Sequence, residues 1–117
     1  MSNFLWLFRG GYHDYNQLSD KEREALNKDW LKWLEDLKGK GKLIDGLPLS
    51  QEGRVVYKRG ELVTNGPFAE GAEVVGGYTI ISAQHMEEAL ALSKGNPHFG
   101  FEEGTLEVRE IIDEEIH

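Results

Sequence analysis

Cysteine is absent from this chain of 117 residues, so disulfide bonds, cysteine-based zinc sites and cysteine nucleophiles are excluded. The amino-terminal apolar run, Phe4–Phe8, is far too short for a signal peptide or a membrane span, and no basic residue precedes it. We therefore expect a cytoplasmic protein with no membrane partner.

Basic residues are scarce relative to acidic ones. Thirteen Lys and Arg stand against 21 Asp and Glu, which gives a net charge of −8. A chain of this charge is repelled by nucleic-acid phosphates. Its basic cluster of Lys38, Lys40 and Lys42 falls at the predicted end of a helix, where it complements the helix dipole. We expect no nucleic-acid partner.

Signatures of cofactor and metal sites are missing as well. No glycine-rich phosphate loop follows a predicted strand, so no cofactor is predicted. His13, Asp14, Glu70 and His98 could meet at a metal only through the fold. No pair among them has the close spacing that identifies a metal site from sequence. No metal is predicted.

The chain has enough bulky apolar residues for the core of one domain over residues 1–117. Phe4–Phe8 is typical of a central strand buried on both faces, and residues 12–18 are predicted to be a polar loop. Ser19 and Glu22 form a capping box for a helix that ends near Lys38. The apolar face of that helix comprises Leu26, Trp30, Trp33, Leu34 and Leu37.

Strands and one more helix follow. Gly46 and Pro48 interrupt an apolar segment and place it at a sheet edge. Ser82 is the predicted cap of the second helix. In order, the elements are a strand at Leu43–Leu49, a hairpin of Arg54–Lys58 and Glu61–Thr64, a strand at Val74–Ile81, a helix burying Met86, Ala89 and Leu90, and a strand at Thr105–Ile112.

This order predicts an α+β fold, a ferredoxin-like split βαβ unit with an inserted β-hairpin. Two helices cover one face of such a sheet and leave the other bare, with Trp6 or its neighbours pointing to it. Large exposed apolar faces usually meet a partner, and the simplest partner is a second copy of the chain. We therefore predict a homodimer.

Rigid turn chemistry is concentrated between two predicted strands. Asn65-Gly66-Pro67 forms a tight turn that presents Phe68 and Glu70, and Gly76-Gly77 then leads into Tyr78. Loops built in this way carry function more often than core strands do, although a plain connecting loop can have the same composition. In the functional interpretation, Gly66 and Gly77 are conformational requirements.

Asn65–Glu70 resembles the signature of the YCII-related family, in the branch named for the sequence Asp-Gly-Pro-Phe (DGPF). The resemblance implies a ferredoxin-like fold that dimerises sheet to sheet, the dimeric α/β-barrel arrangement. Supporting matches cover nearly the whole chain in the family's order: Arg9-Gly10, Trp30–Leu34, Gly41 with Leu43, Gly77-Tyr78 and Glu107–Arg109.

Better-understood relatives in the wider family resemble small-molecule lyases and dehalogenating enzymes, with a His–Asp pair in a pocket between the sheet and the first helix. Trp30 matches the helix position of that His, and Asn65 replaces the first Asp of the branch signature. Both departures remove groups on which the relatives' chemistry depends.

The candidate ligand site lies between the first helix, the sheet and the Asn65–Glu70 loop. Each candidate residue also has an interpretation without a ligand. Arg9 could pair with Glu70 or Glu107, Trp30 could pack in the core, and His13 could lie in a solvated loop. The candidate roles are Glu70 or His13 as acid or base, Arg9 or Arg109 as a clamp for an anion, Tyr78 as proton donor, and Trp30 and Phe68 as aromatic walls.

Two functions follow. The first is a small-molecule-binding homodimer, and, if it is an enzyme, a lyase, isomerase or dehydrochlorinase. The second is a non-catalytic interaction or regulatory module; the family resemblance adds a link to sigma factors of transcription. An enclosed cavity with two or more convergent polar groups favours the first function, and a filled aromatic core favours the second.

Overall fold

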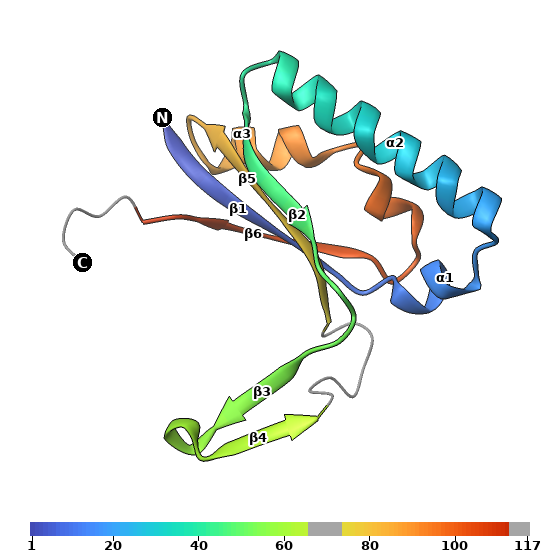
Figure 1. The fold of residues 1–117 in the computed structure, drawn as a ribbon. Helices are drawn as coiled ribbons and strands as arrows, with labels where there is room; N and C mark the ends of the chain where they lie inside the picture. Colours follow the sequence, from blue (N-terminus) through green and yellow to red (C-terminus); the bar gives the residue numbers. More distant parts are fainter. Residues whose placement is uncertain (66–73, 113–117) are drawn as a thin grey trace.

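The computed structural model describes residues 1–65 and 74–112, which form a small α+β unit with helices packed on one face of an antiparallel sheet (Figure 1). Its elements follow the predicted order. They are β1 (Ser2–Arg9), α1 (Tyr12–Gln17), α2 (Asp20–Gly39), β2 (Leu43–Pro48), β3 (Arg54–Tyr57), the 3₁₀ turn η1 (Lys58–Gly60), β4 (Leu62–Asn65), β5 (Val75–Ala83), α3 (Met86–Ser93), the 3₁₀ turn η3 (Pro97–Gly100) and β6 (Thr105–Glu110).

The main sheet has four antiparallel strands in the order β2-β5-β1-β6. The all-apolar strand β1 is central, as predicted, and β2, with Gly46 and Pro48, is an edge strand. Strands β3 and β4 form a separate two-stranded sheet, which projects from the body in Figure 1. The hairpin insertion is therefore an appendage and adds no strand to the main sheet.

Burial alternates along β1, which corrects the prediction for Trp6. Phe4, Trp6 and Phe8 are buried beneath the helices, and Trp6 has no exposed surface. Leu5 and Leu7 occupy the alternate positions on the other face, which we call the open face, and they are only half-buried. Strand period two explains the difference, because adjacent residues point to opposite faces.

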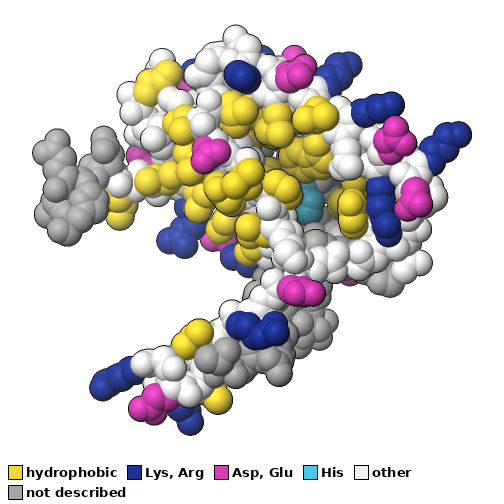
Figure 2. Space-filling model, viewed as in Figure 1, with side chains coloured by type: hydrophobic (Ala, Val, Ile, Leu, Met, Phe, Trp, Pro, Cys, Tyr) yellow, Lys and Arg dark blue, Asp and Glu magenta, His cyan; other side chains and the backbone are white. Residues whose placement is uncertain are grey.

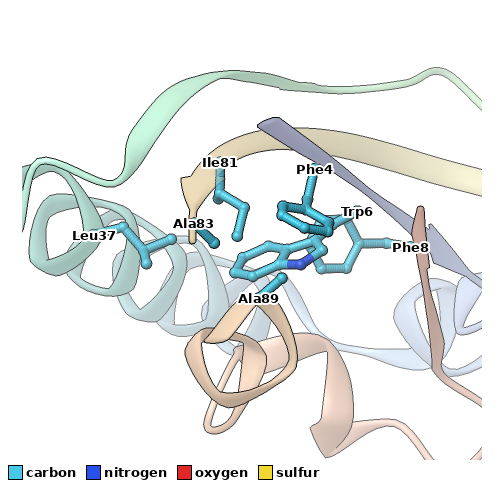
Figure 3. Packing of buried hydrophobic residues seen from close by; sticks show 7 residues of the cluster. All are labelled: Phe4, Trp6, Phe8, Leu37, Ile81, Ala83 and Ala89. Carbon is cyan, nitrogen blue, oxygen red and sulfur yellow. The ribbon is translucent and has the colours of Figure 1, made fainter. Parts of the chain in front are cut away.

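Helix α2 begins with the predicted capping box: Ser19 Oγ accepts from the Glu22 N–H, and Glu22 accepts from the Ser19 N–H. Its aromatic residues pack on β1. The Trp33 ring lies 5.5 Å from that of Trp6, and the Trp30 ring meets Phe8 edge to face at 5.2 Å. Figure 3 shows the buried side chains of β1, β5, α2 and α3 that converge beneath this helix.

Two local predictions are wrong. Residues 12–17 form the short helix α1, not a loop. Helix α3 is capped by His85, whose Nδ1 accepts from the Glu88 N–H, rather than by Ser82. The buried face of α3 also differs from the prediction: Ala89 and Ser93 are buried, while Met86 and Leu90 are exposed.

The sheet face beneath α2 loses side-chain volume toward one end. Ile81, Thr79 and Gly77 follow one another along the helix-facing side of β5, and β2 contributes Gly46 opposite Thr79. A Cβ on Gly46 would lie 2.8 Å from the Tyr78 carbonyl oxygen. At Gly77 it would lie 3.2 Å from the Leu47 carbonyl oxygen, so the constraint on Gly77 is close strand approach rather than a positive φ.

Replacing Gly46 by Ala is expected to destabilise the protein by about 1–3 kcal/mol, because the new Cβ overlaps rigid backbone. Gly39→Ala is the matched control. Gly39 lies in α2 with open space around it, so the same change should stabilise by about 0.5–1 kcal/mol. Urea unfolding of both variants measures the difference. Equal stability of the two would contradict the close packing of β2 against β5.

Glu88 links α3 to the start of β2, and its pKa is lowered chiefly because its carboxylate accepts from the Gln84 N–H, with Lys42 3.5 Å away. A lowered pKa stabilises the fold above the ordinary value of 4.5, and this contribution disappears as the pH falls through the folded-state pKa. Glu88→Gln should therefore reduce the unfolding free energy at pH 7 but not in acid. Denaturant titrations across this pH range measure the effect, and Glu87→Gln, at the exposed neighbouring carboxylate, is the control. If Glu88→Gln lowers the unfolding free energy equally at every pH, the hydrogen bond to the ionised carboxylate is not the cause.

Candidate functional site

A cavity of about 590 Å³ lies between α2 and the part of the sheet where side chains are smallest. Its roof is formed by α2, its floor by β5 and Phe8, and one side by the edge strand β2. Figure 2 shows a hollow bordered by hydrophobic side chains, with a histidine inside it. The residues of these elements that line the cavity include Leu26, Trp30, Leu31, Leu34, Pro48 and Thr79.

The walls of the cavity are largely apolar, and a few polar side chains converge on it. The polar lining residues are Tyr15, Asn27, Ser50, Gln51, Tyr78, Thr79 and His98. None of the lining residues within the described ranges is an Asp, Glu, Lys or Arg. A ligand-sized apolar cavity with several directed polar groups is typical of small-molecule sites.

One end of the cavity is closed by an interaction between α1 and the segment after β2. The side-chain amides of Asn16 and Gln51 exchange hydrogen bonds of 3.3 and 3.0 Å. Arg23 of α2 holds α1 from the other side. Its Nε donates to the Tyr15 carbonyl at 3.2 Å, and its guanidinium lies 5.1 Å from the centre of the Tyr15 ring. Arg23 therefore positions Tyr15 at the cavity.

His98 is buried at the inner end of the cavity, with a side chain fixed on several sides. Its Nε2 lies 2.7 Å from the Arg9 carbonyl oxygen. Its ring meets those of Phe8 and Phe101 nearly at right angles. The Asn96 side chain accepts from the His98 N–H at 2.9 Å and so starts the turn η3.

Sequence analysis named His98 only among four residues that could meet at a metal through the fold. It did not predict that His98 lines the cavity. The available signal was the segment Asn96-Pro97-His98. Asn before Pro initiates a turn, and such a turn just before the last strand returns its side chains toward the sheet. No sequence period links His98 to β1, because the contact joins residues 89 positions apart.

Two predicted site residues border the cavity. Trp30 lines the cavity and also packs on Phe8, so its core packing is observed and its role in ligand binding stays a prediction. Tyr78 adjoins the cavity from β5, but it pairs with Leu7, which directs its side chain to the open face. We therefore assign the contact of Tyr78 with the cavity to its main chain.

Arg9 and Arg109 lie together on the open face. Arg9 Nε contacts Glu107 Oε1 at 3.0 Å, and Arg109 approaches the other oxygen of Glu107 at 3.9 Å. This is the Glu107 alternative of the predicted ion pair. Both guanidinium groups are thus separated from the cavity by the sheet, and the Arg9 carbonyl is the part of Arg9 that reaches the site residue His98.

Three of the remaining residues, Gly66, Phe68 and Glu70, lie outside the described residues. His13 lies in the short helix α1. Within residues 1–65 and 74–112, no three His, Asp or Glu side chains gather as a metal site would require. In the same ranges, no helix combines the length and apolar character needed to cross a membrane.

The fold and the cavity together define a small α+β protein, consistent with the ferredoxin-like type, that encloses ligand-sized space between a helix and its sheet. The model of the YCII-related domain matches residues 9–115, and the chain therefore belongs to the YCII-related family. No curated protein matches the sequence.

A solved structure shares this fold. It is 5-chloro-2-hydroxyhydroquinone dehydrochlorinase from Burkholderia phenoliruptrix, in complex with 2,5-dihydroxybenzoquinone. The similarity covers 90% of each chain with a TM-score of 0.51, at 18% sequence identity. At this identity the comparison establishes a shared fold.

Proposed function

We propose that the protein is a homodimer that binds small ring compounds in the cavity between α2 and the sheet. The observation that carries this proposal is the cavity itself. Its volume of about 590 Å³ lies within the range of ligand sites, roughly 300–1,000 Å³. Polar side chains from α1, α2, β5 and η3 converge on it, which is the arrangement expected of a binding site rather than of a filled core.

The ligand class follows from the walls. Trp30, Phe8 and Phe101 provide aromatic surfaces, and a flat ring suits the space between a helix and a sheet. The dehydrochlorinase of the same fold binds a dihydroxybenzoquinone. This supports a lyase, isomerase or dehydrochlorinase activity, in which Glu70 or His13 acts as acid or base and Phe68 completes the aromatic wall. We also place the chain in the DGPF branch, on the Asn65–Phe68 sequence.

The open face of the sheet supports the homodimer. Its centre is apolar, with Leu5, Leu7 and Ile80 half-buried, and Glu107 and Arg109 border it on β6. Both helices that pack on the main sheet, α2 and α3, lie on the other face (Figure 1). A second copy packed sheet to sheet would cover these side chains and produce the α/β-barrel dimer.

The hairpin β3–β4 supports a second candidate, a non-catalytic interaction module linked to transcription. Val56, Tyr57 and Leu62 of this hairpin are exposed. Arg54, Lys58 and Arg59 outnumber Glu61 there, so the hairpin is basic in an acidic chain. An acidic protein surface would complement it, but the cavity has no role in this alternative.

A dimer is expected by light scattering at micromolar concentration, since burial of about 800 Å² per subunit gives a stable pair. Leu5→Lys should convert it to a monomer, because it places a charge beside Arg109 in the centre of the open face. Val56→Lys, on the exposed hairpin, should leave the dimer intact if the open face is the interface. A monomeric wild-type protein would refute the dimer.

Ligand binding tests the cavity directly. We expect an uncharged monocyclic phenol such as 4-ethylphenol to bind in calorimetric titrations. Asn27→Trp should weaken this binding at least tenfold, because Asn27 borders the cavity from α2 and a larger side chain fills it.

The control is Lys28→Trp, one residue further along α2, where the side chain is 75% exposed and outside the cavity. Its binding should equal that of the wild type. If Asn27→Trp binds as well as Lys28→Trp, the ligand lies elsewhere and the cavity is not the site.

A further inference from the structure

We propose that Nδ1 of His98 is the hydrogen-bond acceptor of the cavity, and that it selects uncharged ring compounds carrying a free hydroxyl. This inference rests on the proposed function, since it names the ligand chemistry of the same cavity. It assigns a role to a residue that neither the sequence signature nor the family resemblance includes.

The first step is the tautomer of His98. Its Nε2 lies 2.7 Å from the Arg9 carbonyl oxygen. A carbonyl oxygen only accepts hydrogen bonds, so Nε2 carries the proton and donates it. In the neutral imidazole the lone pair then lies on Nδ1. The main chain of the central strand β1 therefore fixes which nitrogen of His98 is available to a ligand.

The second step is access to Nδ1. The ring is held by Phe8 at 5.6 Å and Phe101 at 5.9 Å, both nearly perpendicular to it. Among the described residues, Trp6 Nε1 is the side-chain polar atom that is fully enclosed without a partner. His98 lines the cavity, and within the described residues no hydrogen bond to its Nδ1 is found. We therefore assign Nδ1 as the nitrogen that a ligand in the cavity reaches.

The third step is the charge of the ligand. The described lining residues provide no Lys or Arg, and a carboxylate at the proposed acid or base Glu70 would only repel an anion, so an anionic ligand would lose its hydration without gaining a counter-charge there. An uncharged ligand avoids this cost. An acceptor nitrogen among aromatic walls then favours a donor on a ring, which is a phenolic hydroxyl.

The test compares two probes that differ at the hydroxyl. 4-Ethylphenol and its methyl ether, 4-ethylanisole, are titrated into wild-type protein at pH 8, where a phenol with a pKa of about 10 remains uncharged. The phenol should bind roughly fivefold more tightly, the value of one ordinary hydrogen bond. 4-Propylphenol controls for size: it has one carbon more than 4-ethylphenol, as the ether does, but in the alkyl chain and not on the oxygen. If it binds as weakly as 4-ethylanisole, the size of the probe and not its hydroxyl explains the difference in affinity.

His98→Phe keeps an aromatic ring but removes both nitrogens, so the preference for phenol over ether should disappear. His85→Phe is the control, since His85 caps α3 outside the cavity and is 63% exposed; its preference should equal that of the wild type. Should His98→Phe fail to fold, ¹⁵N NMR of wild-type protein replaces it. The Nδ1 resonance of His98 should shift when 4-ethylphenol is added and not when 4-ethylanisole is added.

The outcomes separate the two proposals. Equal binding of phenol and ether by the wild type, or a preference that survives in His98→Phe, overturns the role of His98 and leaves the cavity as a binding site. An unchanged Nδ1 resonance at saturating phenol does the same. If neither probe nor any monocyclic phenol binds, the proposed function fails, and the role of His98 fails with it.

Discussion

The separation between α2 and the sheet is the constraint on which the site depends. Trp33 packs on Trp6 with tilted rings and Trp30 meets Phe8 edge to face, and these contacts set the distance between the helix and β1. Along the neighbouring strand β5, the helix-facing residues shrink from Ile81 through Thr79 to Gly77. A rigid helix cannot follow that decrease, because the aromatic pairs on β1, which lie beside Thr79 and Gly77, fix its height. The space left at the glycine end is the cavity.

Much of the fold was predictable from local signals. The capping box of Ser19 and Glu22, the apolar period of α2 and the central position of the run Phe4–Phe8 depend on nearby residues, and each was confirmed. The predicted burial of that run on both faces was not, since Leu5 and Leu7 are only half-buried. The errors arose where local signals compete. Ser82 is a better cap by composition than His85, but β5 continues to Ala83 because pairing with β1 extends to Ser2. Tertiary pairing therefore overrode the capping preference.

The site was predictable only in part. Sequence reasoning found the helix and strand that form the cavity, and Trp30 as a wall. It chose Arg9 for its guanidinium, whereas the guanidinium pairs with Glu107 on the open face and the carbonyl oxygen of the same residue holds His98. The identity of a side chain does not show which hydrogen bonds its main-chain carbonyl accepts. The contact between β1 and η3 also follows no helix or strand periodicity in the sequence, so the sequence does not reveal it.

The position of β2 at the sheet edge has a dynamic consequence. This strand forms one side of the cavity, and among the described strands it pairs only with β5. The opposite boundary of the cavity, by contrast, is anchored by central β1. Edge strands held by one ladder open at a lower free energy than central ones. Local fraying of residues 43–48 would therefore widen the half-open cavity beneath α2 without global unfolding of the protein.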